Sequence, residues 1–460
     1  MSINFSSLEI GRRALSASQL GINIAGQNIA NVNTPGYSRQ RVQLVDATNT
    51  DLSGRSVVSG VGIAGIQSFR NNFIQSRIQA ETGIAGRLSS QRDALAPVES
   101  TLQGTDNSGL QNALSSFFGG FRDLEANPSS VPLRSIVAQK GANLANAFQA
   151  TRRSLESIRS GTDGEIRSTV DEVNALSQKV ADLNLQIHTS EGAGGEASGL
   201  RDQRGEYVNK LAELTGARST VNTDGTVTLT IGEGRPIVSG DKAFTIQANN
   251  TPPLGLASLT IDGQGATFTD GKIAGLQSAI TETTAQIDSL DSLAGAVVQR
   301  VNALHTGGTD LDGAPGVNFF DNTPPVNASN ISVNASITGN PRLIVSSPLT
   351  QPGQSGTVAG AIAGLLTDPN TTAGTRTGSF SSIFGSMIAE AGEKISEADN
   401  GLETHAAILA QATAQRDAVS GVSLDEEAIS LMQYQKSFEA AARFIKVADE
   451  MTQMILSLAQ

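Results

Sequence analysis

The three histidines of the sequence, His188, His305 and His405, are the residues best suited to bind a metal ion or to act as a general base. They lie far apart along the chain, and none has the H-E-x-x-H spacing that places two zinc ligands on one face of a helix. The sequence contains no cysteine, which excludes disulfide bonds and thiolate metal sites. We therefore predict no metal site and interpret each histidine as a solvated or helix-capping side chain.

Two short glycine-containing segments resemble binding loops for a cation or a phosphate group. Residues 310–313, Asp-Leu-Asp-Gly, begin like a calcium loop, but the remaining ligands and the terminal glutamate of an EF-hand are missing at the required spacing. Residues 232–234, Gly-Glu-Gly, lack the rest of a phosphate-binding fingerprint, and there is neither a G-x-S-x-G nor a Walker A motif. We predict turns at both segments, no cofactor and no catalytic residue, so the chain is not expected to be an enzyme.

Hydrophobic residues recur every seven positions at both ends of the chain, which is the pattern of a coiled-coil seam. A second stripe of small or apolar residues runs beside each seam. We predict that the two terminal helices pair with each other and form the assembly interface of a polymerising subunit. The interface residues are Leu8, Leu15, Ile22, Ile29 and Val32, with Gly11, Ser18 and Ala25 beside them, and Leu424, Leu431, Tyr434, Phe438, Ala441, Ile445, Ala448 and Ile455.

Three glycines weaken the amino-terminal helix, which the pattern places at about residues 5–32. Gly11, Gly21 and Gly26 each cost about 1 kcal/mol in a helix interior relative to alanine. Burial of a large apolar side chain of the seam returns roughly 1.5–3 kcal/mol, but only when a partner covers it. We therefore expect this helix to depend on a partner helix for its stability.

A more specific motif overlaps the end of this helix and continues beyond it. It consists of Asn28, Ile29, Ala30 and Asn31, then Asn33, Thr34, Pro35, Gly36 and Tyr37, then Ser38, Arg39 and Gln40. This stretch resembles the flagellar axial protein family, in which rod, hook and hook-associated proteins share N-I-A-N followed by N-T-P-G-Y near the start. The carboxyl end, with residues 420–427, 433–438 and 448–451, is similar to the terminal block of the same family. Phe438 stands where many relatives have tyrosine, and it keeps the aromatic ring.

Physical chemistry explains part of both motifs without the resemblance. Asn33, Pro35 and Gly36 disfavour helix continuation, so they end the helix and turn the chain. The acidic run 425–427 suits the positive end of the dipole of the last helix. The alternative is that these carboxylates pair with Arg39 or Arg41 of a neighbouring subunit.

Composition excludes several classes of partner. The 460 residues are 38% hydrophobic and only 4% aromatic and include 48 glycines, which describes a chain with thin cores. The net charge is -12 and the sequence has no cluster of basic residues, so neither nucleic acid nor an anionic membrane surface is an expected partner. The start has no apolar core of a cleavable signal, and no run is long enough to span a bilayer. We expect no membrane insertion and, if the chain is exported, a route without a cleaved signal.

The middle of the chain changes from a helical period to a strand period. Helical spacing extends from about residue 69 to 215, and a helix beginning near Leu200 ends at Gly216. From Ser219 the period is two, which predicts strands around residues 227–231 and 259–261 and at Ile331 and Val333. The apolar positions of the helical zone include Leu110, Leu114, Phe117, Phe118, Phe121, Leu124, Ile166, Val170, Val173, Leu176, Val180, Leu183 and Ile187.

These patterns predict a mainly α fold with a β-rich insertion and a nested order of domains. Residues 1–60 and 415–460 form a terminal coiled-coil domain that belongs in the inner wall of a tube. Residues 61–217 and 378–414 form a long antiparallel helical bundle. Residues 218–377 form an outer, β-rich α+β domain with a helical segment near 275–305.

The resemblance implies a structural protein of the bacterial flagellum that joins the hook to the filament. It implies that copies of the chain form a ring or helical layer, contact the hook protein and support a second junction protein. It also implies secretion through the flagellar type III apparatus, with a cytoplasmic export chaperone on the carboxyl-terminal helix. The alternatives are a hook or rod protein, a flagellin-like protein with a host-binding middle domain, and an enzyme carried on an axial scaffold with its site in the insertion.

Overall fold

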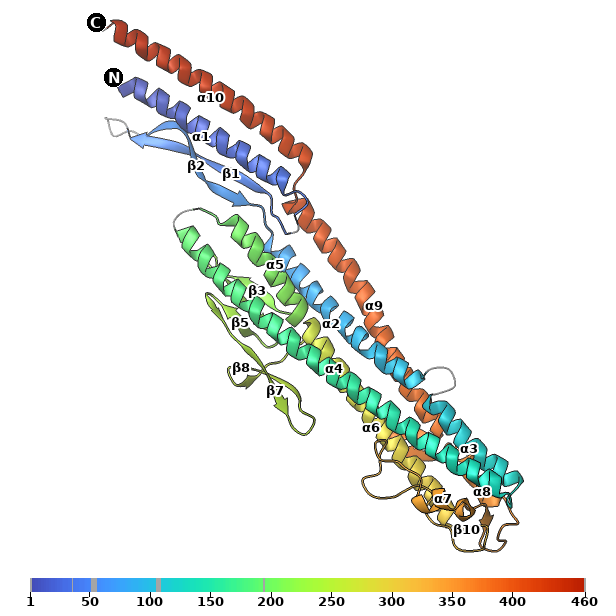
Figure 1. The fold of residues 1–460 in the computed structure, drawn as a ribbon. Helices are drawn as coiled ribbons and strands as arrows, with labels where there is room; N and C mark the ends of the chain where they lie inside the picture. Colours follow the sequence, from blue (N-terminus) through green and yellow to red (C-terminus); the bar gives the residue numbers. More distant parts are fainter. Residues whose placement is uncertain (1, 35, 51–55, 105–108, 193–194, 459–460) are drawn as a thin grey trace.

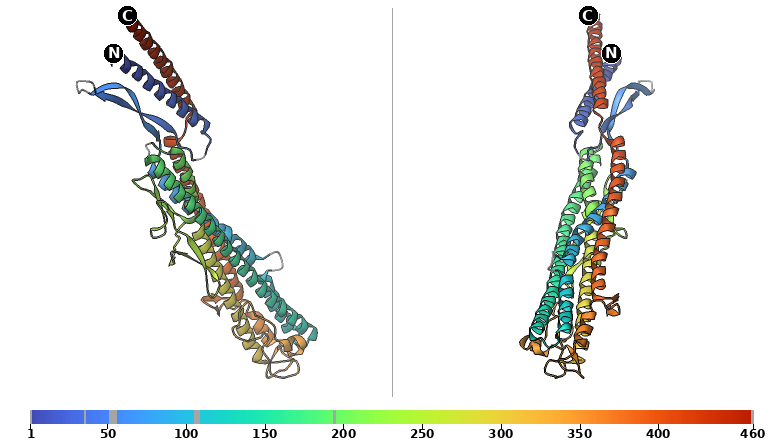
Figure 2. Two further views of the ribbon diagram at one scale, coloured as in Figure 1. Left: turned by 60° about the vertical axis from the view of Figure 1, so that its left-hand side comes forward. Right: turned by 90° about the vertical axis from the view of Figure 1, so that its right-hand side faces the viewer.

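The computed structural model of the chain describes residues 2–34, 36–50, 56–104, 109–192 and 195–458. This part of the chain is mainly helical and elongated, with both chain ends at one end of the molecule (Figure 1). Two further views show the same division into a short section with the chain ends and a longer helical section (Figure 2). None of the described helices is both long and apolar enough to cross a bilayer.

The section with the chain ends contains α1 (Ser2–Ala30), α10 (Leu424–Leu458) and a hairpin of β1 (Gln40–Thr50) and β2 (Ser56–Ser68). We call it the terminal unit. α1 and α10 lie side by side and antiparallel, and the hairpin packs against α1 (Figure 1). Register shifts interrupt the hairpin between Gln43 and Leu44 and between Asp46 and Thr48. Such shifts increase the twist of a strand pair, which suits a hairpin that follows a helix surface.

Long helices form the second section, which we call the bundle: α2 (Asn72–Gln103), α4 (Val131–Gly192), α6 (Gly271–Thr306) and α9 (Phe380–Ser420), with the shorter α3 (Leu110–Ala126) and α5 (Ser198–Thr215). α2 packs against both α9 and α6, and α6 packs against α4. α4 has 62 residues. At 1.5 Å per residue it extends for about 90 Å, so a single helix connects the two halves of the bundle.

A cluster of phenylalanines closes the end of the bundle that lies away from the chain ends. Phe117 of α3 is fully buried, and its ring centroid lies 5.1–5.5 Å from four other rings. These tilted and edge-on contacts are the arrangements that aromatic quadrupoles favour. The short elements at this end are β10 (Gly308–Thr309), α7 (Ala335–Gly339), a 3-10 helix (Pro341–Leu343), β11 (Ser347–Pro348), α8 (Thr357–Gly364), β12 (Thr371–Ala373) and β13 (Arg376–Gly378).

Two small antiparallel sheets lie along the middle of the molecule. Val227, Leu229 and Ile231 alternate with less buried threonines, and they share a second core with the carboxyl-terminal half of α4. The first sheet has the order β3 (Arg218–Val221), β4 (Val227–Ile231), β5 (Arg235–Ser239) and β6 (Lys242–Ala243). The second has the order β7 (Ile246–Thr251), β8 (Leu256–Ile261) and β9 (Gln264–Gly265).

Several predicted elements are confirmed. Every large apolar residue of the patterns at 110–124 and 166–187 is buried on α3 or α4. α5 ends at Gly216, whose φ of 68° is the left-handed conformation that favours glycine at a helix end. The carboxylate of Asp310 accepts hydrogen bonds from the backbone N–H groups of Asp312 and Ala314, so residues 310–313 form the predicted turn.

Two predictions about residues 218–377 are wrong. Ile331 and Val333 do not form a strand, because Ile331 is buried in a loop and Val333 makes an isolated bridge with Phe320. The helical segment near 275–305 is α6, and it packs inside the bundle rather than in a separate outer domain. Its side chains from Ala279 to Val301 share one apolar cluster with α3 and α4. Sequence period identifies a buried face, but it does not identify the element that covers this face.

His305 is fully buried at the end of α6, so its interpretation as a solvated or capping residue is wrong. Its Nδ1 donates to the carbonyl of Val317, and its Nε2 accepts from the N–H of Val345 at 3.0 Å. Both ring nitrogens are therefore used in the neutral form. Burial lowers the pKa of His305 to about 4. The ring joins the loop after β10 to the segment before β11.

We predict that the folded chain loses stability as pH falls from about 6.5 to about 4, in part because of His305. The unfolded chain protonates this residue at its ordinary pKa of 6.5, whereas the folded chain keeps it neutral down to about 4. The contribution is roughly 2–3 kcal/mol. Urea unfolding at pH 7 and pH 4.5 measures the loss, which should be smaller in His305→Gln. An equal loss in the variant and the unchanged chain would contradict the prediction.

Candidate assembly interface

The side chain of Asn28 connects the two ends of the chain. Its Nδ2 donates to Glu427 Oε2 of α10 and to the carbonyl of Gln40, both at 2.9 Å. Its Oδ1 accepts from the Tyr37 hydroxyl at 2.8 Å and from the N–H of Gln40 at 3.1 Å. Asn28 is 1% exposed, and these contacts use both donors and both lone pairs of its amide. The first residue of the N-I-A-N motif is therefore a buried, fully satisfied link between α1, β1 and α10.

The acidic run at the start of α10 pairs with Arg39 of the same chain. Arg39 Nε donates to Glu427 Oε1 at 2.7 Å, and its Nη1 donates to Glu426 Oε2 at 2.6 Å. Glu427 is 3% exposed, so its charge needs a partner in the same place. Arg39 therefore pairs within its own chain, and the alternative of a pair with a neighbouring subunit is wrong for this residue. Antiparallel packing brings the start of α10 to the end of α1. Arg41 is exposed.

The loop after α1 does more than end a helix. Gly36 has a φ of +77°, a left-handed conformation that favours glycine, and a Cβ built on it would lie 2.0 Å from Glu206 Oε1 of α5 and would have to displace that carboxylate. Burial, with the nearby charges of Asp202 and Glu427, raises the pKa of Tyr37 to about 12. The hydroxyl therefore remains a hydrogen-bond donor to Asn28 at any physiological pH. Of the other motif residues, Asn33 and Thr34 are exposed, and Pro35 lies outside the described residues.

The predicted seam residues lie on α1 and α10 or directly beside them, with unequal burial. Ser18, Ala25, Ala441 and Ala448 are buried, whereas Leu424 is 52% exposed and Phe438 is 37% exposed. The side chain of Ile455 lies outside the described part of the structure. The half-buried seam residues are Leu8, Leu15, Ile22, Ile29, Val32, Leu431, Tyr434 and Ile445.

Two glycines of α1 allow the closest approach of α10. A Cβ on Gly11 would lie 2.4 Å from Ile445 Cγ1, and a Cβ on Gly21 would lie 2.5 Å from Tyr434 Cδ1. Gly26, in contrast, has nothing within 4 Å of the corresponding position. Gly11 and Gly21 therefore weaken α1 as an isolated helix but admit the large side chains of α10, and this contact offsets their conformational cost.

The terminal unit also carries apolar side chains that its own elements leave uncovered. On α10, Phe444, Val447, Met451 and Met454 follow one another at intervals of three and four residues and are 45% to 64% exposed. On the hairpin, Leu44, Val45 and Ile63 are 42% to 47% exposed. The four α10 residues follow one face of the helix, and an exposed apolar face of this kind marks an interaction site.

Sequence reasoning missed both the uncovered stripe and the Asn28 link. The stripe had a local signal, because residues 444, 447, 451 and 454 follow a helical period. The hydrogen bond from Asn28 to Glu427 had none, because the two residues are 399 positions apart in sequence.

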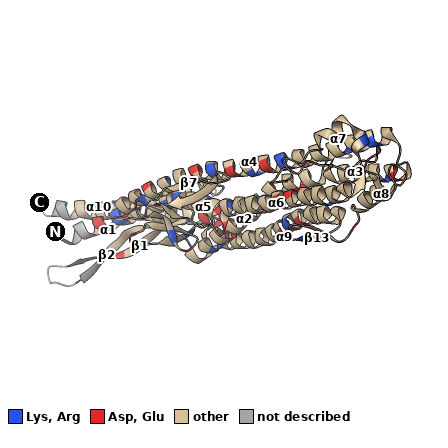
Figure 3. Cartoon of the chain, turned by 90° about the horizontal axis from the view of Figure 1, so that it is seen from below, with Lys and Arg blue, Asp and Glu red and all other residues tan. Residues whose placement is uncertain are grey.

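In the described part of the chain, the histidines do not come together into a catalytic or metal-binding site. His188 is exposed near the carbonyl of Asp224, and His405 Nδ1 lies 2.7 Å from a carboxylate oxygen of Glu81. No group of three or more metal-ligating side chains occurs among the described residues. Acidic and basic side chains are interspersed along the bundle (Figure 3).

Both ends of the chain match family models of flagellar rod proteins. Residues 8–37 match the family model described as "Flagella basal body rod protein", and residues 415–458 match "Flagellar basal body rod FlgEFG protein C-terminal". These two segments hold most of α1 and α10, which the fold brings side by side. The chain is therefore an axial protein of the bacterial flagellum.

Comparisons over longer segments identify the branch of that class. Residues 95–320 match "Flagellar hook-associated protein FlgK helical domain". The flagellar hook-associated protein 1 of Bacillus subtilis strain 168 is 29% identical, over 99% of both chains. That of Salmonella typhimurium is 24% identical, over 96% of this chain and 98% of its own. The chain belongs to the flagellar hook-associated protein 1 family and is a structural component of the flagellum.

The fold agrees with this family. The flagellar hook junction protein FlgK of Burkholderia pseudomallei has a similar structure, with a TM-score of 0.63 at 15% sequence identity. The similarity covers 75% of this chain and all of that chain. At 15% identity the structural similarity supports the fold alone, and the assignment to the family rests on the sequence matches.

We predict opposite effects for two alanine substitutions at glycines of α1. Gly26→Ala should stabilise the helix by about 1 kcal/mol, because alanine is the better helix former and the added Cβ meets no atom. Gly21→Ala should destabilise the pair by about 1–3 kcal/mol, because its Cβ would overlap the Tyr434 ring. Hydrogen exchange of α1 peptides in the purified chain measures both. Equal protection of α1 in the two variants would show that α10 does not pack at Gly21.

Proposed function

We propose that this chain joins the flagellar hook to the filament, as the first of two junction proteins. Its membership of the hook-associated protein 1 family supports this proposal. The observation that carries it is the uncovered apolar surface of the terminal unit, on α10 and on the hairpin. A subunit with a well-packed bundle and an uncovered terminal unit is suited to a polymer, in which neighbours cover that surface.

In the proposed assembly, copies of the chain form a ring or short helical layer whose inner wall contains the paired terminal helices. One side of this layer contacts the hook protein, and the other side contacts the second junction protein. Leu424, Phe438 and the stripe from Phe444 to Met454 are the side chains available for contacts with neighbours. The bundle then lies outside the wall, where it contacts lateral neighbours through its polar surface.

We further propose that the subunit is secreted through the flagellar type III apparatus and acts at the hook–filament junction. An apolar stripe that the described residues leave uncovered is a liability before assembly, because it favours aggregation. A cytoplasmic export chaperone that binds α10 would cover the stripe until export. This role uses the same side chains as assembly, so the two contacts exclude each other.

The test is complementation of a strain that lacks the gene for this chain. The unchanged chain should restore filaments, whereas Phe438→Asp or Val447→Asp should leave hooks without filaments and release flagellin into the medium. The reason is that a carboxylate in the covered wall would lose its hydration. Electron microscopy and the amount of released flagellin are the measurements.

Gln435→Asp is the matched control, because it adds the same charge at an exposed polar position of the same helix. It should support normal filaments. Normal filaments in the Phe438→Asp and Val447→Asp strains would reject the proposed junction role of α10. Polymerisation of the purified chain alone into long tubes would instead favour a hook or rod role, and specific binding to a glycan array would favour a host-binding role.

The chaperone contact has its own test. Phe438→Asp and Val447→Asp should reduce the affinity of the purified chain for its chaperone at least tenfold, because each places a charge in an apolar contact. Isothermal titration with the chaperone measures this, with Gln435→Asp as the control. Unchanged affinity in both variants would place the chaperone contact elsewhere on the chain.

A further inference from the structure

Among the residues that the structure describes, the terminal unit and the bundle share no apolar core. Both core clusters of the described residues draw their members from positions 95–391, and neither includes a residue of α1, α10 or the hairpin. The chain crosses between the two sections at residues 69–71 and 421–423. Polar contacts near these crossings are therefore candidates for setting the orientation of the terminal unit. One is the backbone hydrogen bond from the N–H of Arg39 to the carbonyl of Ser420 at 2.9 Å, and two others involve side chains.

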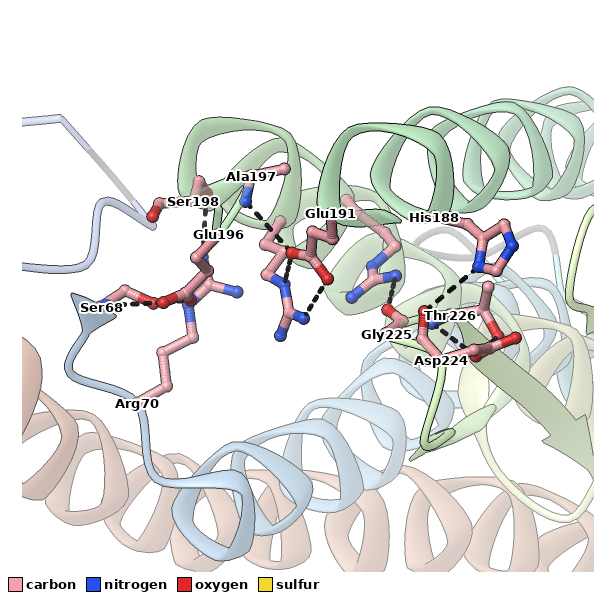
Figure 4. Close-up of polar contacts among 12 residues, drawn as sticks. Ser68, Arg70, His188, Glu191, Glu196, Ala197, Ser198, Asp224, Gly225 and Thr226 are labelled. Carbon is pink, nitrogen blue, oxygen red and sulfur yellow. Dashed lines mark hydrogen bonds and ion pairs between the residues drawn. The ribbon is translucent and has the colours of Figure 1, made fainter. Parts of the chain in front are cut away.

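The first polar contact joins the end of β2 to the turn between α4 and α5. The N–H of Ser68 donates to Glu196 Oε2 at 3.0 Å, and the Ser68 hydroxyl donates to Glu196 Oε1 at 2.5 Å (Figure 4). Both carboxylate oxygens of Glu196 thus accept hydrogen bonds from Ser68 of the terminal unit. Such a bidentate, charge-assisted contact restrains direction as well as distance.

The second polar contact is centred on Asp202 of α5. Its Oδ1 accepts from the Ser38 hydroxyl at 2.9 Å and from Arg70 Nη2 at 2.5 Å, and its Oδ2 accepts from the N–H of Ser38 at 3.4 Å. The same guanidinium donates through Nη2 to the carbonyl of Ser198 at 3.1 Å and through Nε to the Ser38 hydroxyl at 3.2 Å. The side chain of Asp202 is only 13% exposed. One carboxylate of the bundle therefore holds the loop after α1 and the first crossing segment together.

The described residues next to these two carboxylates are held by further ion pairs and hydrogen bonds. Arg201 forms a bidentate pair with Glu191 at 2.6 and 2.7 Å, and Glu191 also accepts from the N–H of Ala197 at 3.1 Å (Figure 4). Arg204 is buried and donates to Asn184 Oδ1 and to the carbonyl of Gly225, both at 2.8 Å. The start of α5 is thus anchored to α4 and to the β3–β4 loop.

We propose that Glu196 and Asp202 are positioning residues that hold the terminal unit at one orientation to the bundle. They form a polar clamp with Ser68, Ser38 and Arg70. When the clamp is broken, the terminal unit rotates about the two crossing segments while both sections keep their internal packing. The proposal goes beyond the junction role, because it concerns the isolated chain and holds whatever the chain assembles with.

The clamp can be tested by distance measurements between spin labels in the full-length chain. The sequence has no cysteine, so labels on Gln435→Cys of α10 and Glu172→Cys of α4 are the only ones present. Both positions are exposed. In the otherwise unchanged chain, the distance distribution should have one narrow peak. In the background of Glu196→Gln with Asp202→Asn, the fraction of molecules outside that peak should rise about tenfold, the factor that corresponds to roughly 1.4 kcal/mol.

Two controls separate positioning from general loosening. Glu213→Gln removes a carboxylate of α5 that pairs with Lys210 and does not reach the terminal unit, so it should leave the peak unchanged. A second label pair, on Glu172→Cys and Glu403→Cys, lies within the bundle and should keep its distribution in the double variant. The proposal is overturned by an unchanged α10–α4 distribution in the double variant, by equal broadening in Glu213→Gln, or by broadening of the bundle pair.

Discussion

The buried amide of Asn28 is the constraint on which the arrangement of the chain ends depends. A buried amide that lacks partners costs free energy comparable to a lost hydrogen bond, and the amide of Asn28 has all of its partners only when α10, β1 and Tyr37 meet it together. Glu427 imposes the same condition from the other side, because its buried charge needs both Asn28 and Arg39. The ends of the chain are therefore joined by mutual satisfaction of polar groups as well as by apolar packing.

Packing on two faces explains the small residues of α1. α1 contacts α10 and also the hairpin, so large side chains on both of these faces would separate its neighbours. Gly11 and Gly21 admit Ile445 and Tyr434, and Gly60 of the hairpin lies against Ile10. Glycine therefore lowers the helix propensity of α1 at the positions where a neighbouring side chain approaches its backbone closely.

The two sections of the molecule divide the work of folding and assembly. The bundle has two apolar cores of its own, closed at one end by the phenylalanine cluster around Phe117. In its described part, the terminal unit has no comparable core and leaves much of α10 uncovered. The family matches follow the same division, since the ends match models of rod proteins and the bundle matches the helical domain of the hook-associated protein. The ends thus carry what the class has in common, and the bundle carries what is particular to the family.

The sequence by itself determined the local elements and the class of protein. Helical periods predicted α3 and α4, the alternation at 227–231 predicted β4, and the motif at residues 28–40 indicated a flagellar axial protein. Only the tertiary structure decided that Arg39 pairs with Glu427 of its own chain, that α6 belongs to the bundle and that His305 is buried. The physical reason is that period and turn chemistry act over a few residues, whereas the partner of a buried face or charge is chosen by packing across the whole chain.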